Sequence, residues 1–356
     1  MLVNPLPAYA EHARPVPDGR HPVVALDIGG TKIAGALVAP DGQVLHKARR
    51  PTPAKEDETV LLAALADVIH DLRSTSVWEE VRAVGVGSTG PVNTAAGTVS
   101  PVNIPGWRSF PITEEVSRLT GGLPVRLVGD AVAMAMGEHW RGAARGAGNA
   151  LCMVVSTGVG GGLLINGRIH PGPTGNAGHI GHISVETSQE RCACGARGCV
   201  EQAASGPSIT RTALCLGWRP PQGEDATARA VAESAGRGDR AAIAAFDRGA
   251  RALAAGVAAT AHLLEVDLAV IGGGVAEAGP VLFAPLRSYL REYATLPFAT
   301  ACRVKPAALG GDAGLVGAAA AALAVHPEDD VKRPTAHPSG LVTVDFPPGA
   351  ARTGSG

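Results

Sequence analysis

The sequence predicts an α/β protein built from two similar domains that face each other across a central cleft. The first observation is that one order of elements, three strands followed by a helix and another strand, occurs twice along the chain. The second is the length, because 356 residues exceed the needs of one small core and suffice for about two domains. The third is that glycine-rich segments follow strands in both copies.

The first copy of this order begins with three apolar runs, which predict three strands: Val23–Ile28, Ile33–Val38 and Val44–Ala48. Turn residues at Gly29-Gly30 and Asp41-Gly42 separate the runs, so an antiparallel meander is expected. A helix follows, since five apolar side chains recur at helical spacing: Leu61, Leu65, Val68, Ile69 and Leu72. Val81–Val86 is the next predicted strand. Later, Val125–Val128 is a predicted strand before a helix that starts near Ala131.

The second copy begins with predicted strands at Ala150–Val155 and Gly162–Ile165, and Asn166-Gly167 is a hairpin turn that leads to a third. A long helix is expected from about Asp239 to Leu264. Its apolar stripe comprises Ile243, Phe246, Ala250, Leu253, Val257 and Leu264. Leu268–Ile271 is a buried strand, and Ala313–Val325 is the last helix.

These elements predict the domain bounds. Residues 22–129, together with the C-terminal helix 312–325, form a small N-terminal domain, and residues 130–311 form a large domain. Residues 1–21 and 326–356 are rich in proline, glycine and charge, and are expected to be disordered tails.

The composition excludes several classes of protein. With 46% hydrophobic and 18% charged residues, the chain is not intrinsically disordered. A net charge of -1 predicts no attraction to nucleic acid or to an anionic membrane. No apolar run approaches the ~20 residues that span a bilayer, and the first residues lack the apolar segment of a secretory signal. A cytoplasmic location is therefore expected, where the six cysteines stay reduced.

The segment Asp27–Lys32 is the first candidate phosphate motif. Gly29 and Gly30 let backbone N–H groups approach a phosphate, Thr31 and Lys32 add donors, and Asp27 can hold a magnesium ion. The alternative is an ordinary hairpin turn. A second glycine motif later in the chain favours the functional interpretation.

That second motif is Ser156–Gly162, in which Thr157, Gly158, Gly160 and Gly161 offer donors without bulky side chains. Glycine costs about 0.5–1 kcal/mol in an ordered strand, which favours phosphate binding over a plain hairpin. The chain has no P-loop sequence. Gly85, Gly87 and Gly90 fit the dinucleotide pattern, but Pro91 stands where a helix should begin, so this segment is predicted to be a loop that lines the cleft.

Asp130 follows a predicted strand and precedes a predicted helix. An N-cap is the ordinary interpretation of such an aspartate. The nearby phosphate motifs instead favour a general base that accepts a proton from a substrate hydroxyl.

A metal site is predicted from four residues within 18 positions: His182, Cys192, Cys194 and Cys199. One histidine and three cysteines match a closed tetrahedral zinc site, and a full set of protein ligands indicates a structural role. Chance clustering and a redox pair are the alternatives. Cys152, Cys215 and Cys302 are expected in the core.

These motifs together resemble the ROK sugar kinases (repressors, open reading frames and kinases) of the actin-like ATPase superfamily, from about Val23 to Val325. The resemblance implies that both domains have the actin-like, ribonuclease-H-like ATPase fold. Gly87–Val92 and Asn103–Trp107 resemble the family's sugar loop, and Gly272, Gly273 and Gly274 its adenosine-side motif. Glu201 matches a sugar-binding glutamate of the family.

The resemblance implies ATP- and Mg²⁺-dependent transfer of the γ-phosphoryl group to the 6-hydroxyl of a hexose, with Asp130 as the base. It places six residues at the sugar: Gly90, Asn103, Asp130, His179, His182 and Glu201. A structural Zn²⁺ would orient His179 and Glu201. Glucose is the default substrate, and N-acetylmannosamine, N-acetylglucosamine or another hexose is the alternative.

Two departures from the family pattern concern the identity of the sugar. Gly129 and Val132 stand where the family has asparagine, and His179 stands where glutamate is common. The rival functions are a transcriptional repressor, disfavoured because only 22 residues precede Val23, and a sugar sensor without activity, disfavoured because Asp130 and Lys32 are retained. A homodimer or a dimer of dimers is expected from the resemblance.

Overall fold

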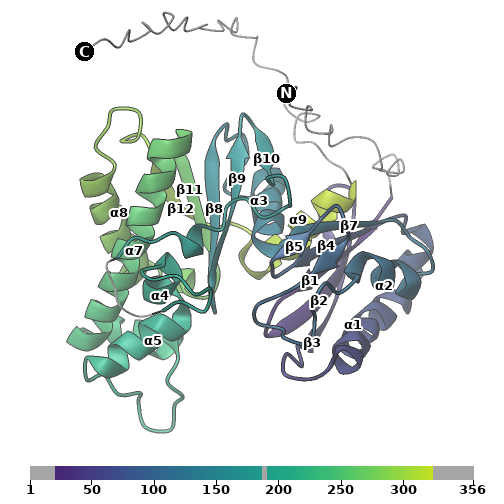
Figure 1. Cartoon of the computed structure of the whole chain (residues 1–356), viewed down its shortest axis with the longest axis horizontal. Helices are drawn as coiled ribbons and strands as arrows, with labels where there is room; N and C mark the ends of the chain where they lie inside the picture. The colour runs from purple at the N-terminus through teal and green to yellow at the C-terminus, as the bar shows by residue number, and fades with distance from the viewer. Residues whose placement is uncertain (1–20, 187–190, 324–356) are drawn as a thin grey trace, which may run out of the picture.

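The computed structural model describes residues 21–186 and 191–323, which form two five-stranded sheets. Figure 1 shows the two sheets in separate halves of the molecule, with helices α3 and α9 between them. The predicted tails, apart from His21, lie outside the described residues.

The N-terminal sheet has the strand order β3-β2-β1-β4-β7. Its strands are β1 (Val23–Ile28), β2 (Lys32–Val38), β3 (Val44–Pro51), β4 (Val84–Ser88) and β7 (Val125–Gly129). The first three are antiparallel, as the meander predicted, whereas β4 and β7 run parallel to β1. β4 begins at Val84 rather than Val81, because a 3-10 turn at Ser76–Glu80 ends at Val81. A small ribbon pairs β5 (Val92–Asn93) with β6 (Thr98–Val99).

Both faces of the N-terminal sheet are covered. Val24, Leu26 and Ile28 of β1 pack in one core with α1 (Glu58–Arg73) and α2 (Ile112–Leu119). The intervening Val23 and Ala25 pack in a second core with α9 (Ala313–Leu323). A strand that is buried on both faces explains the unbroken apolar run in the sequence.

The C-terminal sheet has the order β10-β9-β8-β11-β12. Its strands are β8 (Ala150–Val155), β9 (Val159–Ile165), β10 (Arg168–His170), β11 (Leu268–Gly272) and β12 (Arg303–Pro306). One face packs on helices that include the long α7, and the other packs on α3. The helices of this half are α4 (Val200–Ala204), α5 (Gly206–Cys215), α6 (Ala228–Gly236), α7 (Arg240–Leu264) and α8 (Pro280–Tyr293).

Two details of this half differ from the sequence prediction. Ile243 was expected in the buried stripe of α7 but is 46% exposed, because Ala242, Ala245 and Phe246 form the buried face at the start of this helix. β9 begins three residues earlier than expected and contains the glycines of the second motif. The Asn166-Gly167 hairpin turn between β9 and β10 is confirmed.

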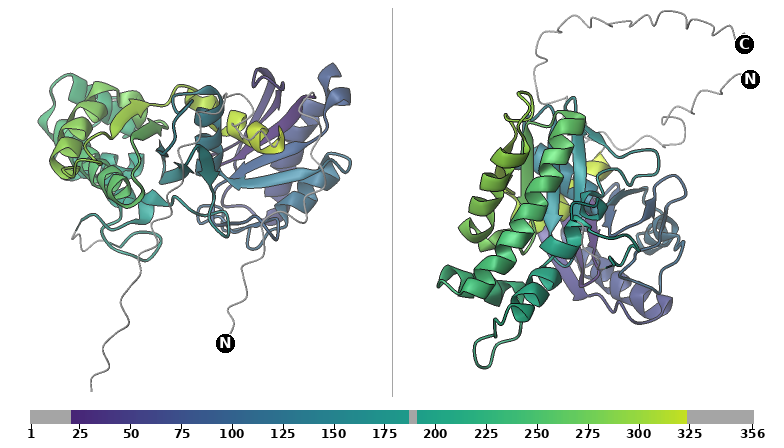
Figure 2. Two further views of the ribbon diagram at one scale, coloured as in Figure 1. Left: turned by 90° about the horizontal axis from the view of Figure 1, so that it is seen from above. Right: turned by 60° about the vertical axis from the view of Figure 1, so that its left-hand side comes forward.

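Helices α3 (Asp130–Arg141) and α9 lie between the two sheets and pack directly on each other (Figure 2). A Cβ on Gly137 of α3 would collide with the carbonyl of Ala313, and one on Gly317 of α9 would collide with the carbonyl of Ala133. Glycine at these two points therefore lets the helix backbones approach closely. The α3–α9 pair connects the two halves of the molecule.

Within the described part of the chain, none of the helices combines the length and the apolar character needed to cross a membrane.

Candidate active site

The first phosphate motif forms the tight turn between β1 and β2. The N–H of Gly29 donates to the carbonyl of Lys32 at 3.0 Å, and the hydroxyl of Thr52 donates to the carbonyl of Gly29 at 2.6 Å. Thr31 and Lys32 are exposed at the turn. The turn is therefore fixed from both sides while its donor side chains stay accessible.

Asn103 of the expected sugar loop lies against this turn. A Cβ on Gly30 would collide with Asn103 Nδ2, so glycine is needed for the two segments to meet. The loop is anchored by Ile104 and Trp107, which are fully buried, and the Trp107 ring stacks on Phe110 at 4.5 Å. Its buried anchors hold the exposed Asn103 beside the glycine turn.

Asp130 is the first residue of α3, where strand β7 ends. Gly129 is the N-cap, so the N-cap interpretation of Asp130 is wrong. Burial, and next the negative charge of Asp27, raise the pKa of Asp130 to about 7, although backbone hydrogen bonds from Ala131 and Asp130 oppose the shift. The Oδ1 atom of Asp130 accepts the N–H of Ala131 at 2.7 Å. A carboxyl group with a pKa near neutrality can take up and release a proton at physiological pH.

Asp27 lies on β1, where β2 and β4 flank it. Burial raises its pKa, and the positive charge of Lys32 partly opposes this effect. Helix α9 approaches the carboxylate closely, since a Cβ on Gly314 would lie 2.9 Å from Asp27 Cγ. Two carboxyl groups thus share a poorly solvated region where the two halves of the molecule meet. A divalent cation bound there would offset their repulsion.

The second phosphate motif and the Gly272–Gly274 segment converge at the C-terminal sheet. The carbonyl of Ser156 accepts the N–H of Gly206, the first residue of α5, at 2.8 Å. Gly273 has φ 90° and packs against the carbonyl of Val155, and the N–H of Val275 donates to that carbonyl at 3.0 Å. The turn at Ser156–Gly158, the start of α5 and the end of β11 therefore form one glycine-lined corner.

The glycines of β9 also meet a packing requirement that their sequence did not suggest. Gly160, Gly161 and Gly162 pair with β8 rather than forming an open loop. Added Cβ atoms at Gly160 and Gly162 would meet Ala131 and Ala135 of α3 at 3.0 and 2.7 Å, and one at Gly161 would meet the carbonyl of Gly178 at 2.8 Å. Close packing accounts for glycine at these three positions, and Thr157 is the exposed residue of the motif.

Gly85 lies in β4, inside the strand predicted at Val81–Val86, and Gly87, which was expected in a loop, lies in the same strand. A Cβ at Gly85 would collide with the carbonyl of Ala318 on α9, and one at Gly87 would lie 3.1 Å from Ala133 Cβ on α3. These glycines make room for the two central helices. Only Gly90 of this group lies beyond the strand.

Gly90 faces His179 from the other half of the chain. A Cβ on Gly90 would lie 3.7 Å from His179 Nε2. The Nδ1 atom of His179 donates to the carbonyl of Asn176 at 2.8 Å, which leaves Nε2 directed toward Gly90. Asn176 also bridges the halves, because its side chain accepts the N–H of Val92 at 3.0 Å and donates to the carbonyl of Val92 at 2.7 Å.

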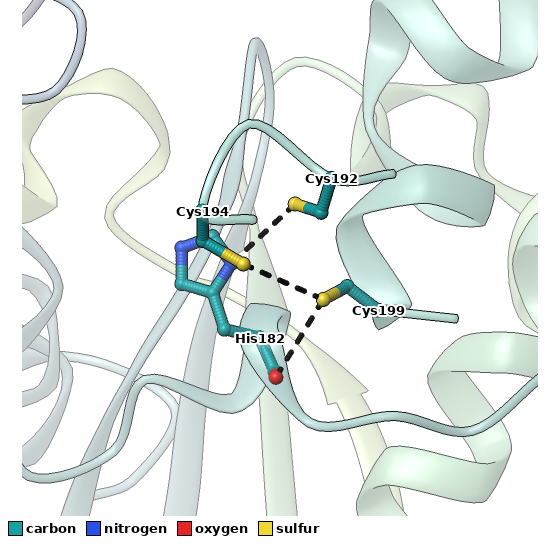
Figure 3. Close-up of side chains that lie close together, drawn as sticks. All are labelled: His182, Cys192, Cys194 and Cys199. Carbon is teal, nitrogen blue, oxygen red and sulfur yellow. Dashed lines mark hydrogen bonds between the residues drawn. The ribbon is translucent and has the colours of Figure 1, made fainter. Parts of the chain in front are cut away.

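The four predicted metal ligands lie together (Figure 3). Their donor atoms are all within 4.8 Å of one another, with 3.8 Å from Cys192 Sγ to His182 Nδ1 and 3.7 Å from Cys194 Sγ to Cys199 Sγ. Bond lengths near ~2.3 Å for sulfur and ~2.0 Å for nitrogen put tetrahedral zinc ligands about 3.5–3.8 Å apart. The donor set and its spacing therefore fit a metal ion, and no disulfide competes, because all six cysteines are free.

The remaining cysteines were expected in the core. Cys152 and Cys302 are buried, but Cys215 is exposed. It is the last residue of α5, and the last buried residue of that helix is Ala213. The expectation for Cys215 was wrong.

Glu201 is the second residue of α4, two positions after Cys199, and its carboxylate connects the metal cluster to β9. Its Oε2 atom accepts the N–H of Val159 at 2.8 Å, and its Oε1 atom is 3.9 Å from Cys192 Sγ. The carboxylate is thus oriented by both the cluster and the glycine strand.

Comparison with known proteins identifies the family to which this arrangement belongs. Residues 23–325 match the ROK family. The chain belongs to the ROK family. The family expected from the sequence is therefore confirmed.

Several relatives of the chain are sugar kinases. The chain is 35% identical over 309 residues to a glucokinase of Thermotoga maritima, which covers 83% of this chain and 96% of the relative. It is 34% identical over 311 residues to a glucokinase of Streptomyces coelicolor and 36% identical over 299 residues to an N-acetylmannosamine kinase of Escherichia fergusonii, with the same coverage. The chain is accordingly a sugar kinase.

Solved ROK structures confirm the actin-like fold. A glucokinase from Streptomyces griseus in complex with glucose and AMPPNP superposes with a TM-score of 0.75 at 33% identity, over 84% of this chain and 98% of the other. A hexokinase from Thermus thermophilus superposes with a TM-score of 0.69 at 34% identity, over 84% and 97% of the two chains.

The structure also adds residues that the sequence did not single out. Asn176 and Gly206 contact predicted site residues, but an isolated asparagine and a glycine before a proline carry no distinctive signal. Glu138 does carry a recognisable signal in the sequence. Its spacing from Ala131, Met134 and Ala135 puts this charged residue on the apolar face of a helix.

Proposed function

We propose that this ROK kinase transfers the γ-phosphoryl group of ATP to the 6-hydroxyl of a hexose, with glucose as the default substrate. The observation that carries the proposal is Asp130, whose pKa is raised to about 7 at the point where the sugar loop and both glycine motifs approach the central helices. The glucokinases among its relatives, and the glucose and AMPPNP in the Streptomyces griseus structure, support the choice of substrates.

Asp130 accepts the proton of the 6-hydroxyl in the proposed reaction. The hydroxyl oxygen then forms a bond to the γ-phosphorus, and the bond from that phosphorus to the bridging oxygen of ADP breaks. The proton ends on a carboxylate oxygen of Asp130 and is released to solvent later. A base with a pKa near 7 is deprotonated often enough to accept the proton and basic enough to drive the transfer.

Phosphate binding is assigned to the two turns that face the central helices. Thr31 and Lys32 at one turn, and Thr157 and Gly158 at the other, present donors to the triphosphate. The glycine-lined corner also includes Gly272–Gly274, and we assign this segment to binding of the adenosine part of ATP. Asp27 is assigned to Mg²⁺, which supplies neutralisation of phosphate charge when bound.

Sugar binding is assigned to Gly90, Asn103, His179 and Glu201. Asn103 is exposed beside the Gly30 turn, and His179 presents Nε2 beside Gly90. His182 was expected to serve both the sugar and the metal. Because its Nδ1 atom faces Cys192, we assign the ring to the metal and leave the sugar contacts to the other four residues.

The Cys3His cluster is assigned to a structural Zn²⁺. Four protein donors leave no open position on a tetrahedral ion. The ion would fix the loop that joins His179 to Glu201, and that loop is also held by the ion pair between Arg248 and Glu186 at 2.9 Å. By holding this loop, the cluster would orient His179 and Glu201, two of the proposed sugar-binding residues.

N-acetylmannosamine is the second candidate substrate. Relatives that are 35–36% identical act on that sugar by name. Gly129, beside the proposed base, has an ordinary extended conformation, and an added Cβ would meet nothing nearer than the carbonyl of Gly175 at 3.6 Å. No steric demand requires glycine here, so the position leaves room beside Asp130 for a substituent on the sugar.

An ADP-release assay across glucose, mannose, N-acetylglucosamine, N-acetylmannosamine and allose tests the proposal. Glucose is expected to give the highest kcat/KM. A higher kcat/KM for N-acetylmannosamine would make that sugar the assigned substrate in place of glucose. ADP release that does not depend on any hexose would reject the proposed function. The homodimeric state and the cytoplasmic location are likewise proposed on the resemblance to ROK kinases.

A further inference from the structure

Glu138 is a completely buried acidic residue in the last turn of α3. Its side chain is 0% exposed, and among the described residues no ion pair includes it. Three backbone N–H groups donate to its carboxylate: Ala143 to Oε2 at 2.6 Å, Ala308 to Oε2 at 3.1 Å and Leu309 to Oε1 at 2.9 Å. Peptide dipoles thus replace water around this charge, as a buried carboxylate requires.

The three donors come from two separate parts of the chain. Ala143 follows α3 directly, whereas Ala308 and Leu309 lie between β12 and the start of α9, some 170 residues later. Glu138 therefore ties the end of α3 to the segment that leads into α9. The fit is close, because a Cβ on Gly142 would collide with Glu138 Oε2.

The hydrogen bonds of Glu138 lie at one end of the contact between α3 and α9, in which Gly137 and Gly317 let the two helices pack closely. Gly137, the neighbour of Glu138, packs on Ala313 at the start of α9. The next residue of α9, Gly314, packs on Asp27. Asp130 begins α3 two turns before Glu138. A shift of the start of α9 along α3 would therefore change the position of Asp27 relative to Asp130.

We infer that Glu138 is a positioning residue for phosphoryl transfer, which acts by fixing the start of α9 against α3 and so setting the relation between Asp27 and Asp130. This inference rests on the proposed roles of those two aspartates. Glu138 itself touches neither substrate. Because a small displacement of reacting groups slows a reaction strongly, loss of the tie is expected to reduce turnover more than sugar binding.

Two variants test the inference in the full-length protein. Glu138→Gln keeps the shape of the side chain but replaces one acceptor oxygen with a donor, which opposes the backbone N–H groups. Gly142→Ala keeps the carboxylate but pushes it out of its position. Thr260→Val is the matched control, because Thr260 is also buried and bonds only within α7, to the carbonyl of Gly256 at 2.9 Å.

The measurements are kcat at saturating ATP and glucose, glucose affinity by calorimetry, and Tm. Glu138→Gln and Gly142→Ala are expected to lower kcat by about 10- to 100-fold, with glucose Kd changed less than about threefold. Thr260→Val is expected to lower Tm while leaving kcat near the wild-type value. An unchanged kcat in both Glu138→Gln and Gly142→Ala, or an equal loss of sugar binding, would overturn the inference. A wild-type protein without hexose-dependent turnover would reject the proposed function, and the inference with it.

Discussion

The main-chain N–H of Val159 donates a hydrogen bond of 2.8 Å to Glu201 Oε2, which joins the glycine-rich strand β9 to the helix that follows the metal cluster. The adjacent Gly158 is shaped by the same carboxylate, because an added Cβ would lie 2.7 Å from that oxygen. The orientation of a proposed sugar ligand therefore depends on a residue of the phosphate motif.

This relationship predicts similar effects from two substitutions. Glu201→Gln removes a charged hydrogen-bond acceptor, and Gly158→Ala displaces it, so each is expected to raise the KM for glucose by about 10- to 100-fold. The double variant is expected to be less impaired than the product of the single effects, because both act on one carboxylate. Steady-state kinetics of the three variants measures this.

Gly148→Ala is the control for the glycine substitution, since an added Cβ there meets nothing within 4 Å. It should leave KM unchanged. Fully multiplicative effects of Gly158→Ala and Glu201→Gln would show that the two residues act independently.

The pH dependence of activity follows from the raised pKa of Asp130. The base must be deprotonated, so kcat/KM is expected to fall tenfold per pH unit below about pH 7, where the carboxyl group becomes protonated. A pH-rate profile between pH 5 and 9 measures this. A profile that stays flat down to pH 5 would be inconsistent with a base whose pKa is raised.

The same pKa shift predicts how pH affects stability. The pKa of Asp130 is raised from 3.8 to about 7, so the folded protein holds the proton more tightly than the unfolded chain does. The resulting stabilisation is fully present below about pH 4 and is lost as the pH rises through 7. Asp130→Asn avoids this loss, so its Tm relative to wild type is expected to be higher at pH 8 than at pH 5. An equal Tm difference at the two pH values would contradict the shift.

The metal proposal predicts one zinc ion per chain in the purified protein. Cys199→Ser is expected to lower the zinc content and to raise the KM for glucose, since the loop that carries His179 and Glu201 loses its anchor. Elemental analysis and steady-state kinetics measure the two effects. Cys215→Ser, at an exposed cysteine outside the cluster, should change neither. Much less than one zinc per chain in the wild type would reject the Cys3His assignment.

The sequence predicted the parts of the fold that depend on local patterns. The β1–β3 meander, the Asn166-Gly167 turn and the proximity of the four metal ligands are confirmed. The proposed roles of the catalytic and sugar-binding residues remain predictions, as do the domain bounds.

The features that the sequence did not predict depend on contacts between distant segments. Gly160, Gly161 and Gly162 form part of β9 because α3 and the segment at Gly178 pack against them, and nothing in their own spacing shows those partners. Glu138 accepts hydrogen bonds from Ala308 and Leu309, which lie in a distant part of the sequence. Local periodicity cannot reveal a bond between residues that are 170 positions apart.

The turnover of Asp130→Asn tests the central claim most directly. With saturating glucose and MgATP, its kcat is expected to be about 10²- to 10⁴-fold below that of the wild type, because the proton acceptor is lost. Its glucose Kd by calorimetry should stay within about threefold of the wild-type value, since the amide keeps the shape of the side chain and its oxygen can still accept the N–H of Ala131. A variant with near-normal kcat would contradict the assignment of Asp130 as the base.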